Sequence, residues 1–585
     1  MCCGTGLTAV SGKAGDMRAL IYTFILGMLS APADQSIRLA SDLLFRLRPI
    51  GLALRAAGSL RNVAFATFLR PAGPPTPKKE LFQTSDRCLA CHNGLSTSAG
   101  EDISIGFSWR PTMMANSARD PYWQAGVRRE TIDHRESRAA IEDECSKCHM
   151  PMARYQSKFE GREGEVFSRL QFGSDNRLAQ MAQDGVSCSL CHQITKEKLG
   201  TPESLVGGFV VDTTRNRGER EEYGPFKIDD GENRIMRTSS GGYRPTEGEQ
   251  IRQSELCATC HTLITTALGP GGQKIGELPE QMPYQEWLNS DFREKQSCQN
   301  CHMPVVEEMV RVTNTLGKFR EGMSRHVFVG GNFFVQRVLN RYRADLGVIA
   351  MPQEFEAAAT RTIEHLKSKT AQISIDRVDV SPGRLRAELS VQNLSGHKFP
   401  TAYPSRRAWL HVTVKDRGGR TVFESGALNP DGSIQGNDND ADPNRFEPHY
   451  TEINTADQVQ IYEDIMVGAN NMPTTGLLTA VRFIKDNRLL PRGFNNETAD
   501  PRTLPQGGAA NDPNFTGGGD KIIYSVSTGN AEGPFQVEAE FWFQPISFRW
   551  ANNLKPYNAP EPKRFTGYYD AMASGSAVML CRAAK

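Results

Sequence analysis

The chain has 585 residues, which is enough for two or three compact units, each with its own core. Its 68 lysines and arginines balance its 67 aspartates and glutamates, so the charge does not point to nucleic acid or to an acidic membrane surface as the partner. The 53 glycines and 33 prolines, with a hydrophobic content of 38%, indicate a soluble protein rich in loops.

The N-terminal region has the features of an export signal. Lys13 and Arg18 precede the apolar stretch 19–29, and Ala31-Pro-Ala33 offers a cleavage site, so we expect residues 1–33 to be a signal peptide. Residues 34–77 form an Arg-rich segment that ends in a Pro-rich linker. They are either an interfacial anchor helix or translated sequence upstream of the true start. Membrane association is expected through this segment only, because no other stretch has about 18 uninterrupted apolar residues.

Two patterns follow the linker. Residues 78–369 combine cysteine motifs with short helical stretches and long polar loops, and they end in two expected helices, 333–342 and 354–369. Residues 370–585 instead alternate apolar and polar side chains between turns rich in Gly, Pro, Asn and Asp, which is typical of a β-sandwich. The expected fold class is α+β: a mostly helical, loop-rich domain followed by an all-β sandwich.

Cysteine gives the most specific information. Ten of the 13 cysteines fall into five C-x-x-C pairs, and a histidine follows each pair. The motifs are Cys88-Leu-Ala-Cys91-His92, Cys145-Ser-Lys-Cys148-His149, Cys188-Ser-Leu-Cys191-His192, Cys257-Ala-Thr-Cys260-His261 and Cys298-Gln-Asn-Cys301-His302.

C-x-x-C-H is the attachment motif of c-type haem, in which two thiols hold the macrocycle and the histidine binds iron as the proximal ligand. The alternative is zinc, which also uses paired C-x-x-C motifs. Histidine is rare in this chain, 11 in 585, and finding it after all five pairs by chance has odds on the order of a few in a billion. The sequence therefore predicts five covalently bound haem c groups.

Each iron needs a sixth ligand if it only carries electrons. We expect His326, His397 and His449 to be sixth ligands, since they lie in turns and loops, and we include His134 among the candidate ligands. Met113 is a further metal-ligand candidate, with its neighbour Met114 as the alternative and core packing as the ordinary role of both. We expect His365 to be solvated on its helix and His411 to lie on a strand without a metal.

A structural hypothesis follows from His397 and His449. If both ligate iron, the β-domain completes haems that are attached to the preceding domain. A chain ending near Thr370 should then bind more carbon monoxide than the whole protein, because its iron sites are open.

The motifs resemble those of a known family. The five C-x-x-C-H motifs, the related segments 144–151 and 297–304, and the segment 184–192 resemble multihaem cytochromes of the cytochrome c-554 type. The segment 393–412 resembles the C-terminal β-domain of some environmental bacterial members. The resemblance implies haems packed in near-contact pairs, mostly with two histidine ligands, as in the related pentahaem nitrite reductases and hydroxylamine oxidoreductase. Ammonia-forming nitrite reductases usually carry lysine in one motif, whereas all five motifs here end in histidine.

Three functions fit these observations. The first is electron transfer in an extracytoplasmic, periplasmic bacterial respiratory chain, between a quinol oxidoreductase and a terminal reductase. The alternative is an oxidoreductase with one open haem that acts on a small nitrogen or sulfur compound. Four cations are candidates to hold its anion: Arg325, Lys398, Arg406 and Arg407. In the third, the β-domain docks the cytochrome to a partner. We favour an electron carrier over an enzyme.

Overall fold

The computed structural model describes residues 79–216 and 218–585. Residues 78–585 form one compact unit. The expected signal peptide, Arg-rich segment and linker lie outside the described residues. Within the described part, no helix is long and apolar enough to cross a bilayer.

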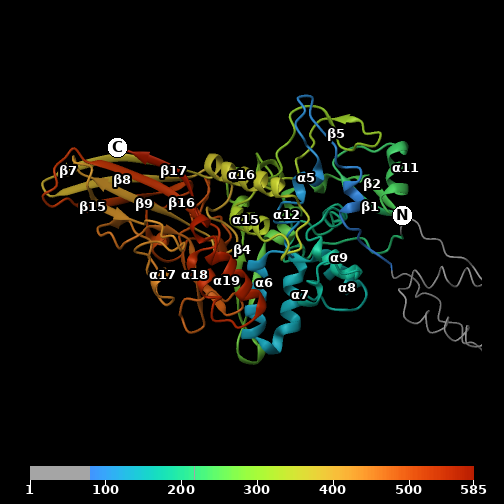
Figure 1. The fold of residues 1–585 in the computed structure, drawn as a ribbon, viewed down its shortest axis with the longest axis horizontal. Helices are drawn as coiled ribbons and strands as arrows, with labels where there is room; N and C mark the ends of the chain where they lie inside the picture. Colours follow the sequence, from blue (N-terminus) through green and yellow to red (C-terminus); the bar gives the residue numbers. More distant parts are fainter. Residues whose placement is uncertain (1–78, 217) are drawn as a thin grey trace, which may run out of the picture. The chain divides into compact units, whose positions relative to one another are not determined.

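The first half of the described chain consists of short helices joined by long loops (Figure 1). Its helices are α4 Asp86–Leu89, α5 Ile105–Trp109, α6 Pro121–Asp133, α7 Arg138–His149, α8 Pro151–Phe159, α9 Arg177–Gln183, α10 Cys188–Cys191, α11 Asp230–Ser239, α12 Ser254–His261, α13 Pro283–Leu288, α14 Cys298–His302, α15 Phe333–Arg341 and α16 Pro352–Lys369. The last two agree closely with the two helices predicted before residue 370.

Six short strands pair locally within this half. They are β1 Arg220–Gly224, β2 Tyr243–Glu247, β3 Leu263–Leu268, β4 Lys274–Gln281, β5 Val310–Arg311 and β6 Phe319–Arg320. β3 and β4 form an antiparallel hairpin, which brings Glu280 into the interior of the molecule.

The second half is built on two large sheets whose strands are mostly antiparallel. Its strands are β7 Ala371–Ser381, β8 Arg384–Asn393, β9 Arg407–Lys415, β10 Thr421–Ser425, β11 Glu452–Ile453, β12 Ile461–Tyr462, β13 Asp464–Gly468, β14 Ala480–Asp486, β15 Gly519–Ser527, β16 Gln536–Gln544 and β17 Val578–Ala584. One sheet has the order β11-β15-β8-β7, with β11 parallel to β15, and the other has the order β10-β9-β16-β17, with β12 paired to β9. The helices α17 Asp438–Ala441, α18 Phe548–Asn552 and α19 Pro560–Asp570 complete this half.

The period-two pattern places one face of each sheet in a shared core. Leu389 of β8 and Tyr524 of β15 belong to the same buried cluster as Leu410 of β9 and Phe541 of β16. Successive side chains of a strand point to opposite faces, so the alternation buries one face and leaves the other polar. The fold class α+β is confirmed.

The same cluster continues across residue 370. It includes Phe333 and Leu339 of α15 and Leu366 of α16, and it reaches Phe565 of α19, which packs against Tyr122 of α6 with ring centroids 5.0 Å apart. The two halves therefore share one hydrophobic core rather than a thin contact.

Candidate haem-binding site

Helical turns present the five motifs. The second and fourth motifs lie at the ends of α7 and α12, and α10 and α14 consist of residues of the third and fifth motifs. The first motif begins inside α4, and beyond it the amide of His92 still donates to the carbonyl of Cys88 at 3.1 Å. Positions i, i+3 and i+4 of a helix share one face. Each pair of thiols and its histidine therefore point the same way.

All five motifs face one cavity of about 1750 Å³. Its wall contains the five motif histidines and every motif cysteine except Cys91. The motif cysteines are all free thiols. Single-ligand pockets measure about 300–1000 Å³, so this cavity has room for more than one large group. Free paired thiols around a space of this size fit several covalently attached macrocycles.

The hydrogen bonds of the motif histidines favour metal binding. Nδ1 of His92 lies 2.6 Å from the carbonyl oxygen of Val312, and Nδ1 of His149 lies 3.2 Å from that of Ser117. Nδ1 of His192 lies 2.5 Å from the carbonyl oxygen of Tyr223, and Nδ1 of His302 lies 2.5 Å from that of Val329. A carbonyl only accepts, so each Nδ1 carries the hydrogen and each Nε2 keeps its lone pair. Metal-binding histidines are typically oriented in this way.

Two further histidines show the same pattern. Nδ1 of His326 lies 3.0 Å from the carbonyl of Ser324, and Nδ1 of His397 lies 2.9 Å from that of Lys398. Both residues line the cavity. Their Nε2 atoms are thus also free to bind a metal.

These two histidines face motif histidines at a specific distance. The ring centroids of His192 and His326 are 6.4 Å apart, and those of His302 and His397 are 6.3 Å apart. With a metal–nitrogen bond of about 2.0–2.1 Å and about 1.2 Å from Nε2 to the ring centre, two imidazoles on opposite sides of one ion have centroids about 6.4 Å apart. The spacing therefore fits one iron between each pair.

Burial keeps these imidazoles neutral. It lowers the pKa of His149 and His261 to about 4 and that of His326 to about 3. Metal ions bind the neutral imidazole, so protons do not compete with a metal for these side chains near pH 7.

Thiols of different motifs are neighbours in the cavity wall. The thiol of Cys88 hydrogen-bonds to that of Cys188, and this bond, with burial, raises the pKa of Cys88. Cys148 and Cys260 are paired in the same way, as are Cys257 and Cys298. The first motif thus lies beside the third, the second beside the fourth, and the fourth beside the fifth. These contacts join the first and third motifs into one group and the second, fourth and fifth into another.

One loop supports two motifs. His326 faces His192 of the third motif, and three residues later the carbonyl of Val329 orients His302 of the fifth. Between them Phe328 has a backbone φ of 41°, a conformation that costs a bulky residue about 1–2 kcal/mol. Such strain is typically found where a loop must place side chains for a function.

Among the described residues, no histidine lies at a comparable distance from His92, His149 or His261. Met113 and Met114 both lie in the cavity wall. The ring of Trp123 stacks on that of His149 with centroids 4.4 Å apart. Met113 therefore remains a candidate ligand.

The structure does not bring His134 to the cavity wall. The residue is buried beyond the end of α6, where Nε2 lies 3.4 Å from the hydroxyl of Thr479 and 3.9 Å from the carboxylate of Glu130. This position argues against the expected role of His134 as an iron ligand.

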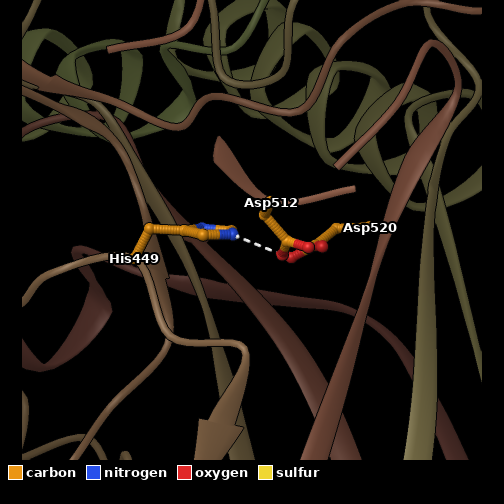
Figure 2. A group of neighbouring side chains, drawn as sticks. All are labelled: His449, Asp512 and Asp520. Atoms are coloured by element: carbon orange, nitrogen blue, oxygen red, sulfur yellow. Dashed lines mark hydrogen bonds and ion pairs between the residues drawn. The ribbon is translucent and has the colours of Figure 1, made fainter. Parts of the chain in front are cut away.

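His449 also lies away from the cavity. It is buried in the β-rich half, beside Asp512 and Asp520 (Figure 2), and its Nε2 is 3.0 Å from the carboxylate of Asp512. Amide nitrogens of Gln460 and Asn487 lie 3.1 and 3.2 Å from its Nδ1. Both ring nitrogens are occupied, which argues against the expected iron ligation by His449.

The same contacts disfavour any other metal at this cluster. The amide oxygen of Asn487 accepts from the backbone of Glu463, and that of Gln460 accepts from the backbone of Tyr450, so both NH₂ groups must face Nδ1. Nδ1 is then the acceptor, and Nε2 carries the hydrogen that it donates to Asp512. A histidine in this tautomer has no lone pair at Nε2 for a metal.

The remaining two histidines differ. His365 of α16 lines the cavity, with its ring centroid 6.4 Å from that of His302, contrary to the solvated position expected for it. It extends the buried stripe of Phe355, Ala358 and Thr362 on its helix, a periodicity that could have revealed it. His411 lies between Glu424 and Glu540 at 3.0 Å from each, in agreement with the expected position without a metal.

Of the four cations considered for anion binding, three are paired. Arg325 pairs with Glu101, Lys398 with Asp486 and Arg407 with Asp440. Arg406 lines the cavity and donates to the carbonyl of Thr401 at 2.8 Å, and no ion pair joins it to a carboxylate of the described residues.

Two tyrosines and two glutamates form a polar section of the cavity wall that the sequence did not reveal. The rings of Tyr122 and Tyr403 are 5.8 Å apart, and the buried hydroxyl of Tyr122 lies beside the hydroxyls of Tyr403 and Ser405. Glu130 and Glu280 are both buried, and burial raises the pKa of Glu280 to about 7. These four residues, here called the phenol–carboxyl pocket, come from α6, β4 and the loop before β9.

Comparisons with known proteins add one finding. No family model matches the chain, and no curated protein matches its sequence. Among solved structures, the chain is similar to a penta-heme cytochrome c552 from Thermochromatium tepidum, with 14% identity and a TM-score of 0.49, over 87% of this chain and 100% of that one. The case for haem therefore rests on the cysteines and histidines of the chain itself.

Proposed function

We propose that the chain is a five-haem c-type cytochrome that transfers electrons outside the cytoplasm. The observation that carries this proposal is the convergence of five C-x-x-C-H motifs on one cavity, with four motif histidines held in the metal-binding tautomer by backbone carbonyls. Haem iron supplies reversible one-electron chemistry when bound. The chain supplies the thiols that attach each group, the histidines that close its iron and the packing that brings the groups together.

The redox partners we propose are proteins, a quinol oxidoreductase on one side and a terminal reductase on the other. Haem attachment and exchange with such partners fit a periplasmic or other extracytoplasmic location. The balanced charge of the chain suits encounters with protein partners rather than with nucleic acid.

Mass spectrometry of protein matured in a host that assembles cytochromes c tests the proposal. We expect a mass five haems above that of the processed chain. Substituting both cysteines of one motif by alanine should remove one haem, whereas substituting Cys581, which lies outside the motifs, should remove none. A wild-type mass with fewer than five haems would contradict the proposal.

A second candidate function is a multihaem oxidoreductase with an open haem that acts on a small nitrogen or sulfur compound. It is favoured by the phenol–carboxyl pocket, whose glutamates Glu130 and Glu280 lie beside Cys145 of the second motif and which offers hydroxyl and carboxyl protons there. The Soret band of the dithionite-reduced protein, with and without carbon monoxide, separates the two functions. An unchanged band supports electron transfer and rules out the oxidoreductase. A shift of at least about one fifth of the absorbance supports an open haem.

A further inference from the structure

We propose that two histidines compete for the sixth position of the iron held by the fifth motif, and that a buried ion-pair network selects His397 over His365. The inference rests on the proposed function, because it concerns the ligands of a bound haem. It goes beyond that function by assigning His365 as a reserve ligand and Glu286 as the residue that positions His397.

Both histidines lie at a ligating distance from His302. The ring centroid of His397 is 6.3 Å from that of His302, with 12° between the ring planes. The centroid of His365 is 6.4 Å from that of His302, with 42° between the planes. An iron held by His302 would take one more imidazole from the protein, so only one of these two rings would bind it at a time.

The loop of His397 is held in place from several sides. Nδ1 contacts the carbonyl of Lys398, and the carbonyl of His397 itself accepts from Asn393 at 2.8 Å and from Ser395 at 2.9 Å. Neither ring nitrogen of His365 has a hydrogen bond to the described protein. His397 is therefore oriented before a metal binds, whereas His365 must lose rotational freedom to do so.

Glu286 ties this loop to the haem-binding half. It lies on α13, between the fourth and fifth motifs, and has no solvent exposure. Its carboxylate accepts from the backbone amide of Lys398 at 3.1 Å and from the hydroxyl of Thr401 at 2.6 Å. The residue next to His397 is thereby fixed to the helix that leads into the fifth motif.

A buried ion-pair network backs this contact. Lys398 pairs with Asp486 at 2.7 Å, and Arg488 pairs with Asp486 at 2.7 Å, with Asp464 at 3.3 Å and with Glu286 at 3.4 Å. Removing one member of such a network leaves an uncompensated charge in the interior. The network therefore holds the His397 loop in one position, and weakening it releases the loop.

Release of the loop lets His365 take the place of His397. Nε2 of His365 would then hold the iron in place of Nε2 of His397, with no electron or proton exchanged. The new ligand has a different ring orientation relative to His302, which changes the low-spin ferric spectrum. It leaves the iron closed to small molecules.

The test uses the full-length holoprotein and the variants H365A, H397A and H365A/H397A. The readouts are the carbon monoxide-dependent Soret change and the ferric electron paramagnetic resonance spectrum. We expect H365A to match the wild type. H397A should bind no additional carbon monoxide but show one altered low-spin signal, and the double variant should bind additional carbon monoxide at about one fifth of the haems.

Three results would overturn the proposal: additional carbon monoxide binding in H397A alone, the same in H365A alone, or none in the double variant. If H397A yields no holoprotein, E286Q is the alternative test variant, because it keeps the shape of Glu286 while removing its charge. E286Q should show two low-spin populations for one haem, and E286Q/H365A should lose the new one. A spectrum of E286Q identical to that of the wild type would overturn the role of Glu286.

Mass spectrometry of the wild type separates this inference from the proposed function. Fewer than five haems would contradict the function itself. Five haems with any of the overturning results would leave the function intact and reject only the competition between His365 and His397.

Discussion

At the scale of single residues, these histidines fall into two groups according to which ring nitrogen is free to bind a metal. In one group Nδ1 donates to a backbone carbonyl and Nε2 is free; its members include His192, His302, His326 and His397. His449 gives Nε2 to a carboxylate instead. For His326, His397 and His449, which lie outside the motifs, sequence context does not distinguish these cases, because all three lie in loops or turns.

We predict that H326A opens the iron of the third motif. Loss of the imidazole that faces His192 leaves a vacant position, so the Soret change with carbon monoxide should grow by about one fifth of the haems. H411A is the matched control, since His411 contacts only glutamates on the sheet surface, and it should change nothing. An unchanged response of H326A would exclude His326 as the ligand.

A second residue-scale prediction concerns Asp520. Its Oδ1 is buried without a hydrogen-bond partner, and burial raises the pKa of the carboxyl above its usual value. A raised folded-state pKa means that stability is fully present below the unfolded pKa of about 3.9 and is lost as the pH rises through the folded value. D520N should therefore stabilise the protein at pH 8 by about 1.4 kcal/mol per unit of pKa shift.

The gain should shrink as the pH falls toward 4, and urea unfolding at several pH values measures it. The amide can still accept from Tyr462, which donates to Asp520 at 2.8 Å, and it can donate toward Asp512. A loss of stability at pH 8 would show that the Asp520 charge is compensated.

At the scale of elements, the start of α6 links a helix cap to the haem site. The carboxylate of Asp120 accepts from the amides of Tyr122 at 2.8 Å and Trp123 at 3.3 Å. Trp123 stacks on His149, and Tyr122 belongs to the phenol–carboxyl pocket. One capping residue thus positions two side chains of the cavity.

We predict that D120A destabilises the protein by about 1 kcal/mol, the usual cost of a lost N-cap, and alters the spectrum of one haem. N176A is a suitable control, because Asn176 caps α9 through the amides of Leu178 and Ala179 and no residue of α9 lines the cavity. It should cost stability locally and leave every haem spectrum unchanged. Identical spectra for the two variants would contradict the link between the cap and the site.

At the scale of the whole molecule, the shared core argues for cooperative folding. Phe333, Leu366, Leu410 and Phe565 belong to one buried cluster that spans both halves. The network also ties the halves together, because Glu286 of the first half takes its ion pair and hydrogen bonds from residues of the second. Domains joined by a large apolar interface behave as one unit rather than moving independently.

We therefore predict a single transition in differential scanning calorimetry of the holoprotein. F565A should lower its midpoint, because removing a fully buried phenylalanine costs about 3–5 kcal/mol. Two separate transitions, with only the later one shifted by F565A, would show that the halves fold independently.

The sequence by itself determined the α+β class, the two final helices before residue 370, the strands after it and the five attachment motifs. These are encoded locally: a period of 3.6 or 2 needs only neighbouring residues, and the motif chemistry needs only five consecutive positions. The sixth ligands were not encoded in this local way, because a histidine ligates through its position in space rather than its place in the chain.

Only the tertiary structure decided which histidines face a motif. It brought His326, His397 and His365 to the cavity wall and placed His134 and His449 outside it. It also assembled the phenol–carboxyl pocket and the Glu286 network from segments more than 100 residues apart. The physical reason is that a free lone pair, a facing distance and a buried counter-charge are properties of packing, and no local pattern of residues contains them.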